Sequence, residues 1–368
     1  MTTKILFLTV MPSPYQRQLF SGLAAAEDID LEVRYYTVGA HDREWQAPDF
    51  EPFETALPGR VISALGPSAH WNPSVISDIK EVDADLVIVS DYSAITAQAV
   101  MRWLSMNNRP FMFWGEVPGF AQRGPLGSFI RGRLQAPLRK AKGIAAIGSR
   151  AEAAYRDLFP AIPTYNIPYF CDLSPYKKAR CGRKSKTGDT IDLLYSGQLI
   201  ERKGVDTLIQ AFTSVAHDLP NLRLQILGNG PDRNKLNDLI PENLKQRVNF
   251  LGHKEPSELP ALFANADLFC LPSRHDGWGV VVNEAIGAGL PVISTDAVGA
   301  ALDIVTNGEN GLITPAGDAD ALAVALRKIS DDETRQRMTK AAMISARSWG
   351  IEEGVSRWRA AAREVLER

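Results

Sequence analysis

The stretch LFCLPSRHDGWGVVVNEAIGAGLPVIST, from Leu268 to Thr295, decides the fold of this chain. Its opening, Leu268–Leu271, is apolar, short and followed by proline and serine, which is typical of a buried strand. Glycines then flank Trp278 and allow the backbone to approach a ligand closely. Three consecutive valines favour a strand by propensity, but the continuation through glutamate, alanine and isoleucine favours a helix over Val280–Ala288. Leu290–Ser294 is predicted to be the next buried strand, so the stretch folds as strand, loop, helix and strand.

The start of the predicted helix suits an anionic ligand. Amides in the first turn of a helix have no intrahelical partner, and the helix dipole adds to their attraction for anions. Glu284 lies four residues after Val280, on the same face and roughly 6 Å further along the axis. A diphosphate at the helix start and a ribose diol at Glu284 match this offset, and Asp276 lies where a sugar on the diphosphate would be. An ordinary α/β crossover with two solvated acids is the alternative.

The spacing Asp276-x7-Glu284, followed by Ala-Ile-Gly-Ala-Gly-Leu-Pro, resembles the signature of the family-four (group 1) glycosyltransferases. The resemblance implies a retaining, metal-independent enzyme with the α/β fold called GT-B. This fold has two Rossmann-like, doubly wound domains facing a central cleft, and a C-terminal helix that crosses back to the first domain. The family usually has Glu at both ends of the signature, whereas Asp276 is one methylene shorter. The resemblance covers most of the C-terminal half well and the N-terminal half in outline.

A second block, GQLIERKG, resembles the family pattern at the end of another predicted strand. Lys203 precedes Gly204 at a helix start, where a lysine holds a diphosphate as a point charge. The family's arginine position is Gln198, which donates a hydrogen bond but no charge, and Arg202 is the candidate to compensate. The alternative for Lys203 is a lysine on a helix surface.

Two weaker matches complete the nucleotide site that the resemblance implies. Gly228 begins a Gly-x-Gly-Pro turn, and His253 and Lys254 occupy the place where family members contact the base, although a plain strand-to-helix turn explains these two equally well. The predicted nucleotide-binding residues are Gly197, Gln198, Arg202, Lys203, Gly228, His253, Lys254, Gly277, Trp278, Gly279, Val280, Val281 and Glu284. The predicted catalytic residues are Lys203, Asp276, Glu284 and Glu116.

The N-terminal half also alternates strands and helices, which predicts a parallel sheet with ligands beyond the carboxyl ends of its strands. Glu116 follows one such strand, where family members often carry a histidine that touches sugar or acceptor. Asp91 is a weaker candidate at another strand end, and loop capping is the alternative for Glu116. Arg17 could reach the diphosphate or be a solvated charge. The long loop of residues 39–60, which holds Trp45, is expected to bind acceptor or to anchor to the core.

Residues 117–151 contain seven basic side chains and no acidic one. Apolar side chains interleave with them, which favours contact with an anionic membrane surface or a lipid-diphosphate acceptor. A solvated helix face that packs on the sheet is the alternative. The basic residues are Arg123, Arg131, Arg133, Arg139, Lys140, Lys142 and Arg150, and the apolar ones are Phe129, Ile130, Leu134 and Leu138.

The composition indicates a globular chain that is long enough for two domains. It has 368 residues, 45% of them hydrophobic and 23% charged, and a net charge of −2 gives no reason to expect a nucleic-acid partner. Three cysteines and five histidines show neither a disulfide framework nor metal-ligand spacing, and the cysteine usage indicates a reducing compartment. The first apolar stretch is too short for a signal peptide, and no run reaches the length of a membrane span. We therefore expect a cytoplasmic protein that contacts the inner face of the cytoplasmic membrane.

The expected domains are 1–173, which binds the acceptor, and 191–349, which binds the nucleotide-sugar, with a linker at 174–190 and a returning helix at 350–368. The resemblance implies a retaining glycosyltransferase that moves a hexose or related sugar from a UDP- or GDP-linked donor to a glycan or lipid-linked acceptor in bacterial polysaccharide or glycolipid biosynthesis. No cofactor or metal is expected. A sugar-nucleotide epimerase of the same fold and a nucleotide-binding module without catalysis are the alternatives. A dinucleotide dehydrogenase is not expected, because Val282 occupies the place of the third glycine in its fingerprint.

Overall fold

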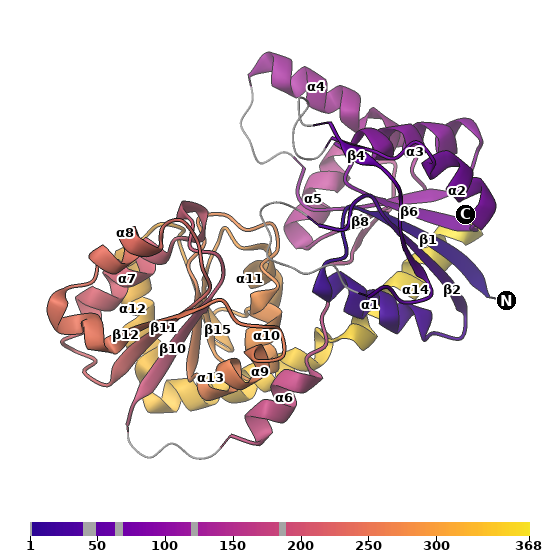
Figure 1. Ribbon diagram of the computed structural model, residues 1–368. Coiled ribbons are helices and arrows are strands. Elements are labelled where there is room, and N and C mark those ends of the chain that lie inside the picture. Colours follow the sequence, from indigo (N-terminus) through magenta and orange to yellow (C-terminus); the bar gives the residue numbers. More distant parts are fainter. Residues whose placement is uncertain (1, 40–48, 63–68, 119–123, 184–188) are drawn as a thin grey trace. The chain divides into compact units, whose positions relative to one another are not determined.

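A computed structural model describes residues 2–39, 49–62, 69–118, 124–183 and 189–368 (Figure 1). The chain divides into two compact units. The first unit comprises Met1–Tyr169 together with Ile351–Arg368, and the second comprises Phe170–Gly350. Each unit is built around one large parallel sheet, and most of the described connections between successive sheet strands contain a helix, because parallel strands need a crossover connection.

The first unit contains a seven-stranded sheet in the order β3-β2-β1-β6-β7-β8-β9. The chain winds from β1 to one edge and from β6 to the other, so the strand order reverses between β1 and β6. The strands are β1 (Thr3–Thr9), β2 (Ile29–Tyr35), β3 (Glu54–Ala56), β6 (Leu86–Ser90), β7 (Phe111–Gly115), β8 (Gly143–Ala146) and β9 (Thr164–Asn166). The helices are α1 (Pro14–Ala24), α2 (Val75–Val82), α3 (Ile95–Met106), α4 (Pro125–Gln135), α5 (Ser149–Leu158) and α14 (Ile351–Glu367).

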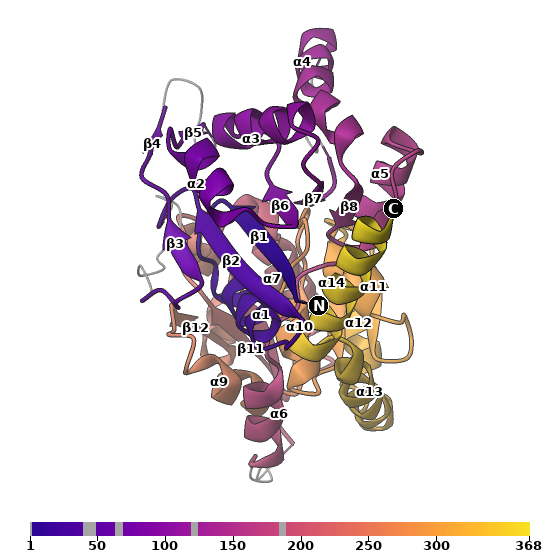
Figure 2. The same ribbon diagram turned by 90° about the vertical axis from the view of Figure 1, so that its right-hand side faces the viewer.

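The C-terminal helix α14 belongs to the core of the first unit, beside α1 (Figure 2). Trp358 on α14 is only 1% exposed, and its ring centroid lies 5.0 Å from that of Phe7 and 5.4 Å from that of Trp114. The ring of Phe20 on α1 lies 5.0 Å from that of Phe7. Burying these aromatic side chains contributes strongly to packing, so the expected return of the last helix to the first domain is confirmed.

The second unit contains a six-stranded parallel sheet in the order β12-β11-β10-β13-β14-β15. This is the Rossmann order, and its switch point lies between β10 and β13. The strands are β10 (Ile191–Ser196), β11 (Leu222–Leu227), β12 (Val248–Gly252), β13 (Leu268–Leu271), β14 (Val292–Thr295) and β15 (Gly311–Thr314). The helices are α6 (Ser174–Cys181), α7 (Val205–Val215), α8 (Arg233–Asp238), α9 (Leu259–Asn265), α10 (Val281–Gly287), α11 (Gly299–Ile304), α12 (Ala319–Ser330) and α13 (Asp332–Ser345).

The structure differs from the sequence prediction in three segments. The expected loop of residues 39–60 contains strand β3, while Trp45 lies outside the described residues. The alternation of strands and helices also predicts a strand near 61–65; of these residues the structure describes only 61 and 62, and Arg60–Val61 form β4, which pairs antiparallel with β5 (His70–Trp71) outside the main sheet. The expected linker at 174–190 begins with α6, because Tyr176 is buried and packs edge-on against Phe263 with centroids 5.4 Å apart.

Candidate functional site

The loops that follow β10 and β13 meet at the switch point of the second unit. Lys203 lies in a 3-10 turn (Glu201–Lys203) after β10, and Asp276 lies in the loop after β13. Lys203 Nζ is 2.5 Å from Asp276 Oδ2, and both side chains are 13% exposed. Two residues that are 73 positions apart in the sequence, both predicted to be catalytic, therefore form a largely buried ion pair.

Backbone contacts hold these two loops together. The amide of Arg274 donates to the carbonyl of Arg202 at 2.9 Å, and the Arg202 guanidinium donates to the carbonyl of His275 at 2.8 Å. Gly204 has φ +65°, and a Cβ at this position would lie 2.2 Å from the carbonyl oxygen of Pro272. Only glycine fits such an approach, which explains the Lys-Gly pair of the sequence pattern.

A third loop, after β11, joins the same layer of backbone. Gly228 has φ +126°, and a Cβ there would lie 2.0 Å from the carbonyl oxygen of Gly197. The amide of Gly228 donates to the carbonyl of Gly252 at 2.8 Å, and the amide of Leu199 donates to the carbonyl of Asn229 at 2.8 Å. The predicted residues Gly197 and Gly228 are thus in direct contact at the carboxyl ends of neighbouring strands.

The glycine-rich loop before α10 presents its backbone beside these strand ends. The helix begins at Val281, one residue later than predicted, and the amides of Val282 and Asn283 donate to the carbonyls of Gly279 and Val280. The amides of Gly279, Val280 and Val281 precede these bonds and, by helix geometry, have no intrahelical acceptor. Since α10 spans only seven residues, its dipole is small, and an anion would be held mainly by these amides and the nearby cations.

Trp278 does not offer its side chain to a ligand. It is 2% exposed, its indole N–H donates to Asn283 Oδ1 at 3.0 Å, and its ring packs 6.0 Å from that of Trp349. The carbonyl of Trp278 accepts from the amide of Ala300 at 2.8 Å. The ring anchors the loop to the core, so nucleotide binding by Trp278 stays a prediction that only its backbone could fulfil.

Glu284 lies in the first turn of α10 and is half-buried. Burial raises the pKa of its carboxyl to about 7, and the hydrogen bond with the Tyr176 hydroxyl acts in the opposite direction. Glu284 therefore changes its charge close to neutral pH. The sequence analysis missed Tyr176, because it lies in the segment that was predicted to be a linker.

The remaining predicted nucleotide contacts lie at the margin of this loop layer. Gln198 is exposed, and its carbonyl accepts from the Tyr195 hydroxyl at 2.8 Å. His253 is exposed, and Lys254 Nζ lies 3.3 Å from a carboxylate oxygen of Glu258. His253 and Lys254 follow β12, which is the edge strand of the sheet and lies two strands away from β10.

In the first unit, Glu116 follows β7 and is exposed. The Tyr169 hydroxyl is 3.5 Å from Glu116 Oε1, and the Tyr155 hydroxyl donates to the carbonyl of Glu116 at 2.9 Å. Asp91, at the end of β6, has φ 60° and accepts from both the amide and the hydroxyl of Ser93, at 2.8 and 2.5 Å. Asp91 thus caps its own turn, while the catalytic role of Glu116 stays a prediction.

Arg17 is neither solvated nor available for a diphosphate, which corrects the prediction. Its guanidinium makes a two-pronged ion pair with Glu54, with distances of 2.5 to 3.0 Å. Glu54 is 5% exposed and also accepts from the Tyr35 hydroxyl at 2.6 Å. The pattern could not reveal this pairing, because the strand that carries Glu54 was itself not predicted.

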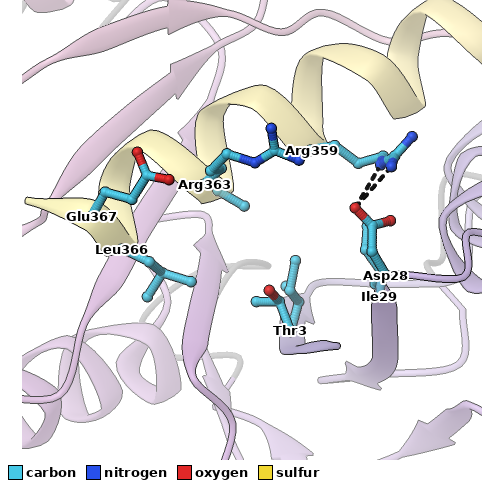
Figure 3. Close-up of a pocket in the computed structure, with 9 residues that line it drawn as sticks. Thr3, Asp28, Ile29, Arg359, Arg363, Leu366 and Glu367 are labelled. Carbon is cyan, nitrogen blue, oxygen red and sulfur yellow. Dashed lines mark hydrogen bonds and ion pairs between the residues drawn. The ribbon is translucent and has the colours of Figure 1, made fainter. Parts of the chain in front are cut away.

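A cavity of about 310 Å³ in the first unit contains none of the predicted site residues (Figure 3). It lies at the amino ends of β1 and β2, against the last turns of α14, and Arg359 pairs there with Asp28 at 2.8 Å. Ligands of doubly wound sheets bind at the opposite, carboxyl edge. The residues that line the cavity are Thr3, Ile5, Asp28, Ile29, Arg359, Ala362, Arg363, Leu366 and Glu367.

Comparison with known proteins finds a family match within the second unit. Residues 182–344 match the family model described as Glycosyl transferases group 1. A GDP-mannose-dependent monoacylated alpha-(1-6)-phosphatidylinositol monomannoside mannosyltransferase of Corynebacterium glutamicum is 30% identical over 203 residues, which is 51% of this chain and 52% of that protein. The chain spans about half or less of the length of the curated relatives that it matches.

Two solved structures resemble almost the whole chain. Sucrose-phosphate synthase from Thermosynechococcus elongatus has a TM-score of 0.76 at 21% identity and covers 99% of both chains. HepE of Anabaena, solved in complex with UDP, has a TM-score of 0.73 at 19% identity and covers 98% of this chain and 100% of its own. At these identities the likeness shows the fold, which is GT-B as predicted.

Proposed function

We propose that the chain, of which residues 182–344 match the family model described as Glycosyl transferases group 1, is a retaining glycosyltransferase. Its donor is a nucleotide-diphospho-sugar, and its acceptor is a glycan or a lipid-linked sugar of bacterial polysaccharide or glycolipid biosynthesis. The observation that carries the proposal is the contact between Lys203 and Asp276 at the switch point, beside the amides of Gly279–Val281. Both residues belong to the two sequence blocks that resemble the family pattern, and a doubly wound sheet binds nucleotides at this place.

Each group has a distinct task in the proposed reaction. Lys203, Arg202 and the amides of Gly279–Val281 hold the diphosphate and stabilise the negative charge that grows on it as the bond to the sugar breaks. Asp276 accepts hydrogen bonds from sugar hydroxyls and so orients the anomeric carbon. Glu284 accepts hydrogen bonds from the ribose hydroxyls in its ionised form.

We further propose that the sugar keeps its anomeric configuration. The bond from the anomeric carbon to the leaving phosphate oxygen breaks, the acceptor oxygen bonds to the same face, and the departing phosphate takes the acceptor's proton. A double displacement would instead need a carboxylate at the anomeric carbon, and Glu116 or Asp91 are the candidates. NMR of the first-formed product should show the donor's configuration, and an inverted product would refute the proposal. Activity that survives in Glu116→Gln would argue against a nucleophilic Glu116.

The donor can be identified by ligand-induced stabilisation. A ligand that binds the native state raises the melting temperature, so UDP, GDP and their hexose conjugates should separate in a thermal-shift screen. HepE was solved with UDP, and the Corynebacterium relative is named for GDP-mannose, so both bases belong in the screen. Donor turnover should then require an added acceptor. Turnover without any acceptor other than water, with an isomerised nucleotide-sugar as product, would instead indicate an epimerase.

We propose that no metal is needed, because Lys203 and Arg202 supply positive charge at the diphosphate. Activity should be unchanged after dialysis against a chelator such as EDTA. Loss of activity that added Mg²⁺ restores would contradict this part of the proposal.

We also propose that helix α4 (Pro125–Gln135) contacts an anionic membrane surface. Figures 1 and 2 show α4 projecting from the first unit, and its Phe129 and Ile130 are 67% and 45% exposed beside the exposed Arg133. Exposed apolar and basic side chains on one helix suit the boundary of an anionic bilayer. Leu138, which was expected to share this face, is instead buried in the core. Among the described residues, no helix combines the length and apolarity needed to cross a bilayer.

Sedimentation with lipid vesicles tests the membrane contact. The protein should bind vesicles that contain phosphatidylglycerol, bind less as salt increases, and lose binding when Phe129 and Ile130 are both changed to serine. Val324→Ser is a matched control, because Val324 is 63% exposed on α12 in the second unit. Equal binding by the double variant would refute the role of α4.

A further inference from the structure

The two side chains that the proposed function assigns to different parts of the donor are bonded to each other in the ligand-free site. Lys203 Nζ and Asp276 Oδ2 are 2.5 Å apart, and each side chain is only 13% exposed. A charge pair with so little solvent around it interacts more strongly than one on the surface. A diphosphate that takes Lys203 must therefore first displace the Asp276 carboxylate, or bind beside a like charge.

The charges around Asp276 show which cations its carboxylate and an incoming diphosphate would compete for. Arg202 Nη1 lies 3.4 Å from Asp276 Oδ1, so Asp276 faces two cations. Arg274 is engaged elsewhere, because it makes a two-pronged pair with Asp206 at 2.8 Å. Removing the Asp276 charge would leave Lys203 and Arg202 without this carboxylate partner, while Arg202 keeps its hydrogen bond to the carbonyl of His275.

We propose that Asp276 is a specificity-determining residue that makes the site prefer the nucleotide-sugar over the bare nucleoside diphosphate. This inference rests on the proposed function. When the whole donor binds, sugar hydroxyls donate to the displaced carboxylate and compensate it for the lost contact with Lys203. When the bare diphosphate binds, no group does so, and the carboxylate remains as a negative charge close to the phosphates. The same competition favours release of the nucleoside diphosphate once the sugar has been transferred.

Calorimetric titration of the wild-type protein and of Asp276→Asn tests this competition. The probes are UDP and UDP-glucose, and GDP and GDP-mannose. For whichever nucleotide and its sugar conjugate bind the wild-type protein, Asp276→Asn should lower the Kd of the bare nucleotide roughly tenfold, within the usual range of coupling between two sites. The Kd of the nucleotide-sugar should stay the same or rise, so the preference for the nucleotide-sugar should fall by tenfold or more.

Two further variants make the result specific. In a Lys203→Ala background, Asp276→Asn should tighten binding of the bare nucleotide much less than it does in the wild type, because only the more distant Arg202 is still contested. Asp206→Asn removes a carboxylate that pairs with Arg274 in the same unit, and it should leave the preference within about twofold of wild type, as expected for a weakly coupled surface charge. Thermal unfolding of each variant verifies that it is folded.

Three results would overturn the inference. They are unchanged or weaker binding of the bare nucleotide by Asp276→Asn, an equal gain in the Lys203→Ala background, and an equal gain in Asp206→Asn. Failure of the proposed function looks different, because the wild-type protein would then bind neither the nucleotides nor the nucleotide-sugars.

Discussion

The two units share the order of their first six sheet strands, to which the first unit adds a seventh, but they differ in how the loops beyond their strands are built. In the second unit, three loops at the switch point are joined by close backbone contacts, such as Gly204 against Pro272 and Gly228 against Gly197. The charged side chains there, Lys203 and Asp276, are bonded across the switch point. In the first unit, the cation after the first strand, Arg17, is instead bonded to a buried glutamate of the edge strand.

Under the proposed function, this difference separates the nucleotide-binding loops of the second unit from a contact that only stabilises the fold of the first. Contacts between backbones demand glycine at fixed positions, so the second unit carries a recognisable sequence signature. The Arg17 ion pair satisfies a buried charge and fastens α1 to β3, which any well-packed pair of side chains could do. A nucleotide bound to loops of the first type meets a surface whose shape is fixed before binding, which lowers the cost of association.

The largest expected effects separate Lys203 from Arg17. Lys203→Ala should reduce transition-state stabilisation by about 2–4 kcal/mol, the scale of losing one oxyanion donor, and should lower the melting temperature less than Arg17→Ala does, because Arg202 remains beside Asp276. Arg17→Ala should instead reduce the free energy of unfolding by about 2–4 kcal/mol, because it leaves Glu54 charged and buried, and nucleotide affinity should not change. Steady-state kinetics and chemical denaturation measure the two effects. Lys245→Ala, in an exposed pair with Glu242, is the control, and turnover by Lys203→Ala within threefold of it would show that the diphosphate role is wrong.

Replacing glycine with alanine at two positions should change the free energy of unfolding in opposite directions. A Cβ at Gly230, in the second unit, would lie 2.3 Å from the carbonyl oxygen of Leu199, so Gly230→Ala should destabilise by about 1–3 kcal/mol. A Cβ at Gly132, on α4 of the first unit, meets no atom within 4 Å, so Gly132→Ala should stabilise by up to about 1 kcal/mol through helix propensity. Urea denaturation of both variants measures this contrast. Equal effects would mean that the close backbone contacts of the second unit are not rigid.

Glu284 should make the protein less stable as pH rises. Burial raises the folded-state pKa of its carboxyl to about 7 from an ordinary value of 4.5, so the native state binds the extra proton between these values and stability falls across that window. The gain in unfolding free energy of Glu284→Gln over the wild type should therefore be about 1–2 kcal/mol larger at pH 8 than at pH 4.5. This value is smaller than the full shift in pKa would give, because Glu284 keeps partial solvent contact. Denaturation curves at several pH values test this. A difference from wild type that does not vary with pH would rule out the raised pKa.

Glu54 should show the smaller and opposite slope. Burial acts to raise its pKa, but hydrogen bonds from Arg17 and Tyr35 outweigh burial and lower it. Its contribution is then present above the unfolded pKa of about 4.3 and is lost as the pH falls through the folded value. Glu54→Gln should thus be least harmful in acid and more harmful at neutral pH. A constant penalty at all pH values would indicate that only shape matters at this position.

The sequence predicted the second unit more fully than the first, for a physical reason. Apolar strand runs, helix ends and positive-φ glycines are local signals, and the strand Leu268–Leu271 begins and ends where the pattern indicated. In the first unit, β3 has only three residues and no apolar run, so no local signal marked it or the partner that it offers to Arg17.

By itself, the sequence determined the α/β class, the strand and helix alternation, and the spacing of Lys203, Asp276 and Glu284 along the chain. Tertiary structure alone decided that Lys203 and Asp276 neutralise one another, that the Trp278 ring is buried, and that Tyr176 reaches Glu284. The reason is that local patterns set backbone conformation, whereas the partner of a side chain depends on which distant loops the strand order brings to the same edge of the sheet.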